Sequence, residues 1–234
     1  MIFNTFQQLR KQALSESTRE YKARGIKVKR CSVCQLMVDY CICNEHPSLS
    51  SNVDFILLYH PDEIFKPTNT GRLIADAFPE NTFAFSHSRT KPQKELLDLI
   101  NDPNRECIIV FPVSDEQQRN VVTDLKNTSV AKNKKNIHKK LTLIFLDGTW
   151  RQGRRMFNGS QWLQSYSVLR INPSDKSLYA TRKAACDSHL STAESAALAL
   201  ASAGDEKNAQ ALFDYFSLFN RRYSKMRSNL KPKT

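Results

Sequence analysis

Short apolar runs alternate with segments of helical period along most of the chain. A short run of mostly apolar residues between polar stretches indicates a buried strand. We expect strands at 53–58, 82–86, 107–112, 141–146 and 168–171, which read VDFILL, TFAFS, CIIVFP, LTLIFL and VLRI. We expect helices at 4–24, 68–78, 92–100, 114–125, 190–203 and 206–225. Strands that alternate with helices predict an α/β fold, a mostly parallel sheet with helices on both faces.

Length and charge narrow the class of protein. The 234 residues suit one full domain with a small appendage. Lys and Arg number 35 against 23 Asp and Glu, and the formal net charge of +12 favours a polyanionic partner such as nucleic acid. No apolar run approaches the roughly 20 residues of a membrane span, and the first residues lack the pattern of a signal peptide. We therefore expect a cytoplasmic protein with no membrane partner, and its oligomeric state stays open.

Four cysteines lie close together near the N-terminus. Cys31, Cys34, Cys41 and Cys43 form the pattern C-x2-C-x6-C-x-C. In a reducing compartment such a cluster binds metal more often than it forms disulfides. Four thiolates complete the tetrahedron around Zn²⁺, which predicts a structural zinc knuckle with no open position for chemistry. His46 can replace one thiolate, and an iron–sulfur cluster also fits the ligand count.

The cysteine cluster divides the expected organisation into two parts. Residues 1–50 hold the expected N-terminal helix and zinc-binding knuckle, and residues 51–234 hold the α/β domain with a basic C-terminal tail. The segment 126–140 carries six lysines and no acid, and it predicts an exposed loop. The sequence contains no GxGxxG, phosphate-loop or HExxH motif. The simplest dinucleotide-binding, nucleotide-triphosphatase and zinc-protease activities are therefore excluded.

Polar side chains follow three of the expected strands. His60 comes soon after the first, Ser114 comes two residues after Pro112 at the end of the third, and Asp147 directly follows the fourth. Sites of parallel α/β sheets lie at the carboxyl ends of the strands, so we expect a site here. The Asp147 carboxylate can accept a proton as a general base, hold an ammonium group, or cap the helix that follows.

The residues around Asp147 and the cysteine pattern together resemble a known family. Asp147, Thr149 and Trp150 are similar to the D-x-T-W signature of the DTW-domain proteins, the tRNA-uridine aminocarboxypropyltransferases, and the cysteine pattern resembles their zinc knuckle. Residues 60–73 (HPDEIFKPTNTGRL) resemble the family's His-Pro…Lys-x-x-Asn-Thr-Gly segment. Residues 191–195 (STAES) resemble its Ser-Thr-x-Glu-Ala motif, with serine in place of the usual last alanine. The motifs stand in the family's order over most of the chain.

The resemblance implies a reaction, a fold and a partner. It implies that the 3-amino-3-carboxypropyl group of S-adenosylmethionine is transferred to N3 of a tRNA uridine, with release of methylthioadenosine. It also implies a SPOUT-like catalytic domain with a trefoil knot, a rare feature in proteins. The competing interpretations are an S-adenosylmethionine-dependent RNA methyltransferase and a non-catalytic, zinc-containing RNA-binding protein. The sequence does not indicate whether the uridine lies in the variable loop or the D-loop.

The strand ends and the resemblance together predict the residues of the site. Asp147 is the expected catalytic residue. The expected cofactor-binding residues are Pro112, Ser114, Thr149, Trp150, Ser191, Thr192 and Glu194. The expected substrate-binding residues are His60, Lys66, Asn69, Thr70, Arg151, Arg154 and Arg155. Several of them have a purely structural alternative, because Ser, Thr, Asn and Glu in these places also cap helices, tryptophan fills cores, and arginines form solvated faces.

Overall fold

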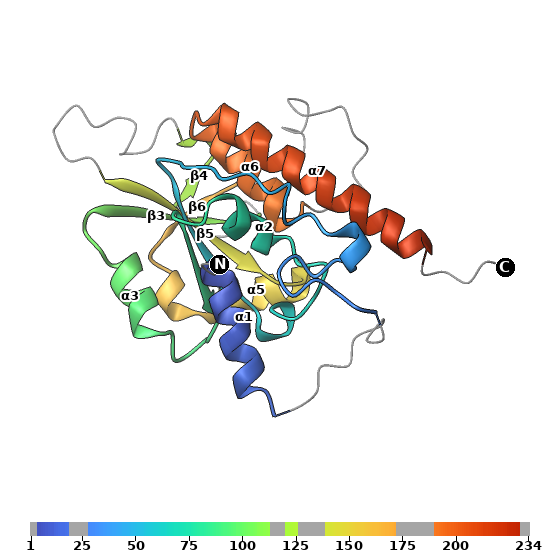
Figure 1. Ribbon diagram of the computed structural model, residues 1–234. Helices are drawn as coiled ribbons and strands as arrows, with labels where there is room; N and C mark the ends of the chain where they lie inside the picture. Colours follow the sequence, from blue (N-terminus) through green and yellow to red (C-terminus); the bar gives the residue numbers. More distant parts are fainter. Residues whose placement is uncertain (1–3, 19–27, 113–119, 126–138, 172–189, 230–234) are drawn as a thin grey trace.

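Two long apolar segments, DFILLY and KLTLIFLD, form the centre of the sheet in the computed structural model (Figure 1). The structure describes residues 4–18, 28–112, 120–125, 139–171 and 190–229. Its strands are β1 (Asp54–Tyr59), β2 (Thr82–Ser86), β3 (Arg105–Val110), β4 (Val121–Val122), β5 (Lys140–Asp147) and β6 (Ser167–Leu169). They form one sheet in the order β2-β1-β5-β3-β6-β4, and all neighbours are parallel. The expected α/β fold with a mostly parallel sheet is confirmed.

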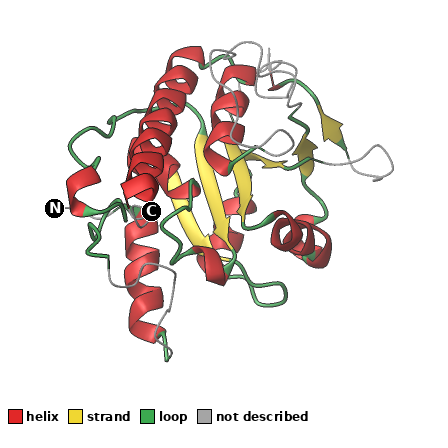
Figure 2. Cartoon of the chain, turned by 90° about the vertical axis from the view of Figure 1, so that its right-hand side faces the viewer, coloured by secondary structure: helices red, strands yellow, loops and turns green. Residues whose placement is uncertain are grey.

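Helices cover both faces of this sheet (Figure 2). They are α1 (Thr5–Glu16), α2 (Gly71–Ala77), α3 (Lys94–Ile100), α5 (Trp150–Gly159), α6 (Thr192–Ser202) and α7 (Glu206–Asn229), with short 3-10 turns at Val38–Tyr40, Pro61–Glu63 and Gln161–Leu163. Phe55 and Leu57 of β1 belong to the core that contains α1, α2, α6 and α7. Ile56 and Leu58 belong to the core that contains α3 and α5. Because side chains alternate along a strand, β1 must be apolar throughout to bury both faces.

Two expected helices differ from the structure. The helix expected at 114–125 is wrong at its end, because Val121 and Val122 form β4 beside β6. The branched side chains of valine suit a strand. The helix expected at 4–24 ends at Glu16 within the described part of the chain. Residues 113–119, 126–138 and 172–189 lie outside the described residues, so the start of the 114–125 helix, the exposed lysine-rich loop and the trefoil knot stay predictions.

The cysteine region packs onto the same core as the sheet. Cys34, Leu36 and Ile42 are buried in the cluster that also holds Phe55 of β1 and Phe219 of α7. The division of the chain at residue 50 into two domains stays a prediction.

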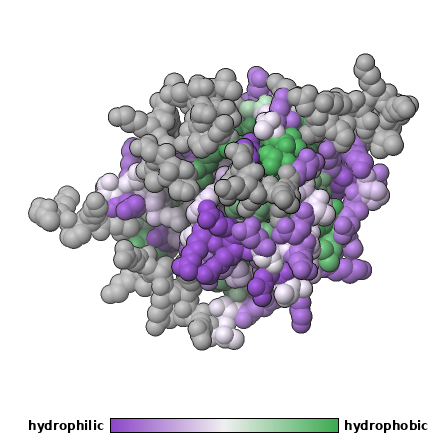
Figure 3. Space-filling view, turned by 180° about the vertical axis from the view of Figure 1, so that it is seen from behind, coloured by the Kyte–Doolittle hydropathy of each residue, from purple (hydrophilic) through white to green (hydrophobic). Residues whose placement is uncertain are grey.

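None of the described helices is both long and apolar enough to cross a membrane. The face turned away from the viewer of Figure 1 carries a strongly hydrophilic patch near its centre (Figure 3).

Candidate active site and metal centre

The carboxyl ends of β1 and β5 lie side by side and bring Tyr59 opposite Asp147. The backbone amide of His60 donates to the carbonyl oxygen of Asp147 at 2.8 Å. The two strands β1 and β5 therefore end side by side at the same edge of the sheet. Thr149 then caps α5, and its hydroxyl accepts from the amide of Gln152. The sheet register therefore determines where the Asp147 carboxylate lies.

The Asp147 carboxylate is buried, with 4% of the residue exposed. Its Oδ1 accepts a hydrogen bond from Asn69 Nδ2 at 2.5 Å, while Oδ2 makes no hydrogen bond of regular geometry with the described residues. Burial raises the pKa of Asp147 to about 7, and the nearby Glu63 carboxylate adds to the rise. The Thr192 side chain, Asn69 and the Gly71 amide favour the ionised form and limit the rise. At neutral pH this group therefore exchanges readily between its two protonation states.

Gly71 allows α2 to come close to this carboxylate. A Cβ atom at this position would lie 2.2 Å from Asp147 Oδ2 and 3.1 Å from the Tyr59 hydroxyl. The Tyr59 hydroxyl is also buried without a hydrogen-bond partner among the described residues. Burial and the charge of Asp147 hold the pKa of Tyr59 well above its usual range. Two buried polar groups thus meet against a glycine, which marks the position as chemically unusual.

Asn69 is held by the first turn of α2. Its side-chain oxygen accepts from the amide of Arg72 at 3.0 Å, and its carbonyl oxygen accepts from Arg72 Nε at 3.0 Å. Arg72 is itself buried, donates to the carbonyl oxygen of Cys34, and lies with its guanidinium 5.0 Å from the centre of the Phe219 ring. A continuous set of contacts therefore joins the cysteine region to Asp147.

A cavity of about 240 Å³ is lined by Leu146 and Gly148, the two chain neighbours of Asp147, although Asp147 itself is not one of its lining residues. It lies at the ends of β3 and β5 and at the starts of α5 and α6, and we call it the strand-end cavity. Its walls are Val110, Phe111, Pro112, Phe145, Leu146, Gly148, Thr149, Trp150, Gly153, Ile171, Leu190, Thr192 and Ser195. The Trp150 ring stacks on Phe111 with centroids 5.6 Å apart and planes 6° apart. This mostly apolar cavity with a few polar groups has the character of a small-molecule site.

The expected cofactor-binding residues divide into two groups. Pro112, Thr149, Trp150 and Thr192 line the strand-end cavity. Ser191 and Glu194 instead form a capping box at the start of α6, in which each side chain accepts a hydrogen bond from the other residue's amide. Ser114 lies outside the described residues.

The expected substrate-binding residues are more scattered. His60, Arg154 and Arg155 line a second hollow on the other side of α5. Asn69 contacts Asp147, whereas Lys66 forms an ion pair with Glu63. Thr70 is half-buried, and its side chain makes no capping hydrogen bond to α2. Arg151 is exposed and lines neither hollow.

Sequence reasoning missed five residues near these sites. Tyr59 and Arg72 surround Asp147 and Asn69, Ser195 lines the strand-end cavity, and His87 and Arg89 line the second hollow. His87 directly follows β2, and Arg89 comes two residues later. The rule that sites lie at strand ends could therefore have found them.

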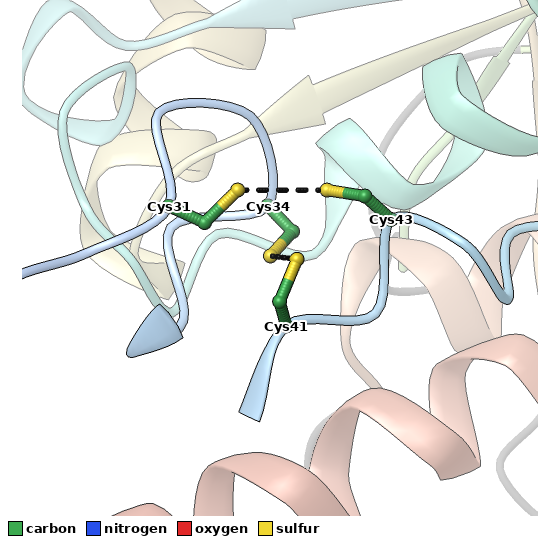
Figure 4. A group of neighbouring side chains, drawn as sticks. All are labelled: Cys31, Cys34, Cys41 and Cys43. Carbon is green, nitrogen blue, oxygen red and sulfur yellow. Dashed lines mark hydrogen bonds between the residues drawn. The ribbon is translucent and has the colours of Figure 1, made fainter. Parts of the chain in front are cut away.

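The four clustered cysteines converge as the spacing predicts (Figure 4). Their sulfur atoms all lie within 4.8 Å of one another, with Cys31 and Cys43 3.6 Å apart and Cys34 and Cys41 3.7 Å apart. Four sulfurs around zinc, each at about 2.3 Å from the ion, would be about 3.8 Å apart. The cluster can therefore hold a single metal ion such as zinc. His46, the alternative ligand, is not part of the group.

Gln35 directly follows Cys34 and closes the turn that carries the first two cysteines. Its backbone has a φ of 59°, in the left-handed region that few residues other than glycine adopt. Its side-chain nitrogen donates to the carbonyl oxygens of Cys31 and Ser32 at 3.2 and 2.7 Å, and its oxygen accepts from Arg10 at 3.0 Å. These contacts stabilise a turn that would otherwise be strained.

Comparison with known proteins concerns both the cysteine cluster and the Asp147 site. No solved structure matches the chain. The sequence profile of the DTW domain matches residues 28–224, which include the four cysteines, Asp147 and the strand-end cavity. Because this match covers most of the chain, the protein belongs to the DTW-domain family.

Proposed function

We propose that this protein is a tRNA-uridine aminocarboxypropyltransferase that acts in the cytoplasm. It transfers the 3-amino-3-carboxypropyl group of S-adenosylmethionine to N3 of a uridine and releases methylthioadenosine. The observation that carries the proposal is Asp147, a buried carboxylate whose pKa is about 7, beside the strand-end cavity. Membership of the DTW-domain family is consistent with a tRNA-modifying enzyme.

The chemistry is an in-line displacement at carbon. The N3–H of uridine loses its proton, N3 forms a bond to the terminal methylene of the aminocarboxypropyl group, and the bond from that methylene to the sulfonium sulfur breaks. Sulfur takes the electron pair and leaves as a neutral thioether, so the protein need not stabilise a charged leaving group. Its main tasks are to orient the two reactants and to remove the proton.

Asp147 is the group best suited to accept the N3 proton of the uridine. A general base works best when its pKa lies near the operating pH, and the pKa of Asp147 is about 7. Its Oδ1 is held by Asn69, whereas Oδ2 makes no hydrogen bond of regular geometry with the described residues, so we assign the N3 proton or the ammonium group of the cosubstrate to Oδ2. The Thr192 side chain beside it favours the charged form.

The strand-end cavity suits the cosubstrate. Phe111 and Trp150 provide a stacked aromatic wall for a purine ring, and Thr149 and Thr192 provide hydroxyl groups. The four-cysteine knuckle holds zinc in a structural role, because four thiolates leave no position on the ion for a reactant.

The test is a reaction of the purified protein with unmodified tRNA and S-adenosylmethionine, followed by mass spectrometry of the nucleosides. We expect a uridine that gains the aminocarboxypropyl group, with an equal amount of methylthioadenosine, and fragment mapping then locates the modified loop. Asp147→Asn should lower the rate about 100-fold or more. A uridine that gains only a methyl group would identify a methyltransferase. Binding of tRNA without consumption of S-adenosylmethionine would identify an RNA-binding protein.

A further inference from the structure

The second hollow lies on the other side of α5 from the strand-end cavity. It has a volume of about 690 Å³ and is lined by α5 and by residues that follow β1 and β2. Trp150 and Gly153 of α5 face the strand-end cavity, whereas Gln152 and Met156 face this hollow. We call it the α5 groove, and α5 is its shared wall with the strand-end cavity.

Three arginines and no acidic side chain line the α5 groove. Arg89, Arg154 and Arg155 are exposed, and none of them forms an ion pair with another described residue. At one end of the groove His60 lies 3.5 Å from the carboxylate of Asp62. The groove therefore presents three uncompensated positive charges, which favours an anionic ligand.

The backbone and the aliphatic stem of Arg89 are packed against α5 and the turn that follows it. Trp162 Nε1 lies 3.2 Å from the carbonyl oxygens of both Ser88 and Arg89 and donates to them. A Cβ atom at Gly159 would lie 3.1 Å from Arg89 Cδ, so the side chain packs closely over the end of α5. A side chain whose stem is already packed loses less conformational entropy on binding.

His87 adds a neutral aromatic side chain to the lining of the α5 groove. Its ring stacks on Trp162 with centroids 6.0 Å apart, and its Nε2 lies 2.8 Å from the Ser160 hydroxyl. Burial and the proximity of His60 lower the pKa of His87 to about 4, so it is neutral at pH 7. A groove that holds a neutral aromatic side chain and arginines suits a sugar–phosphate chain with its bases.

We propose that the α5 groove binds the RNA backbone next to the modified nucleotide, with Arg89, Arg154 and Arg155 as phosphate ligands. This inference rests on the proposed function, since RNA is the substrate there. The planar guanidinium group matches two phosphate oxygens at once, which makes arginine well suited to this contact. The Arg154 guanidinium also lies 5.5 Å from the centre of the Trp150 ring, at the edge of the strand-end cavity. A strand in the groove therefore passes close to the cavity into which a splayed base would turn.

The test measures RNA binding apart from chemistry, by anisotropy of a labelled tRNA over about 50 to 200 mM salt. Arg89→Gln, Arg154→Gln and Arg155→Gln should each lower the slope of log affinity against log salt by about 0.7 to 1 and weaken binding about tenfold. Arg221→Gln on α7 removes the same charge from another exposed position and should change affinity less than twofold. Gly159→Ala keeps every charge but displaces Arg89, so a smaller loss, about threefold, is expected.

Several results would overturn the assignment. One is a wild-type protein that does not bind tRNA, another is an unchanged slope in Arg89→Gln, and a third is an equal loss in Arg221→Gln. Polyglutamate serves as the probe for an acidic protein. If the wild type bound polyglutamate but not tRNA, and the groove variants did not bind polyglutamate, the groove would be assigned to an acidic protein instead. Failure of the proposed function has a different signature, because tRNA would bind with the groove-dependent slope but receive no aminocarboxypropyl group. Thermal unfolding of each variant verifies that it is folded.

Discussion

The cysteine knuckle and the Asp147 site reach their geometry by different routes. In the knuckle four sulfur atoms lie within 4.8 Å of one another, and as thiolates they would repel without a cation between them. Asp147 is instead positioned by the register of β1 and β5, by Asn69 and by the close approach of Gly71. The knuckle can therefore gain stability from a bound cation, whereas the Asp147 site is formed by strand pairing, a hydrogen bond and packing. Arg72 contacts both, so the two regions are not independent.

Loss of one metal ligand should produce the largest effect. Cys34 is buried at the centre of the knuckle, so Cys34→Ser should release the metal and cost roughly 5 kcal/mol of folding free energy, a fall of about 10 °C or more in Tm. Calorimetry and metal analysis measure the two quantities. Cys107→Ala is the control, because this buried cysteine of β3 lies outside the cluster and should leave the metal content unchanged. If the wild type freed of all metal had the same Tm as the metal-loaded protein, the knuckle would not gain stability from the ion, and the contrast with the Asp147 site would be wrong.

Arg72→Met tests the connection between the regions. It keeps the volume of the side chain but leaves the carbonyl oxygens of Asn69 and Cys34 without their donor, which should cost about 3 kcal/mol. Metal release should become faster and uridine modification slower in the same variant. Arg222→Gln removes a surface ion pair with Glu45 and should cost less than about 1 kcal/mol. If Arg72→Met changed metal release without changing modification, the two regions would be independent.

Gly71→Ala probes the Asp147 site alone. The new methyl group would lie 2.2 Å from Asp147 Oδ2, so the carboxylate must move, at a cost of about 2 kcal/mol. Modification should fall sharply while the metal content stays the same. Gly153→Ala is the stability control, because its Cβ would meet Phe111 at an ordinary 3.4 Å inside a helix. Its stability should be equal or higher by up to about 1 kcal/mol.

Ser195→Ala should have the smallest effect. Ser195 lines the strand-end cavity, and alanine is the usual residue of the motif that this segment resembles. We expect a change in stability of less than about 0.5 kcal/mol. The KM for S-adenosylmethionine should change less than threefold. A tenfold rise in KM would show that the Ser195 hydroxyl takes part in cosubstrate binding.

The fold class and the central strands of the sheet could be predicted from the sequence because these strands are strongly apolar. LTLIFL and VDFILL are buried on both faces, so their patterns left little choice of structure. The two valines of β4 were missed because such a short edge strand has no pattern of its own, and the preceding Ser114 and Asp115 favoured a helix. The convergence of the four cysteines followed from their spacing.

The residues of the site were predictable where a polar side chain stands at a strand end or in a family motif, as Asn69 and Thr192 do. Asp147 directly follows the strongest expected strand, 141–146, and is the last residue of β5, whereas Tyr59 resembles the last core residue of its own strand. The unusual state of Tyr59 depends on Gly71 and Asp147, which come close only in the folded sheet. Arg72 looks like an ordinary helix residue, because no sequence pattern shows that its guanidinium turns inward. Ser191 and Glu194 form the capping box that their spacing predicted, and their role in cofactor binding stays a prediction.

The rate of uridine modification against pH, measured by mass spectrometry of the product nucleoside in single turnovers, tests the central claim most directly. Burial raises the pKa of Asp147 to about 7, and only the ionised carboxylate can accept a proton or hold an ammonium group. The rate of aminocarboxypropyl transfer by the wild type should therefore rise through a midpoint near pH 7 and level off above it, and Asp147→Asn should be slow at every pH. The account would be contradicted by an Asp147→Asn variant that transfers the group at the wild-type rate with the same pH profile.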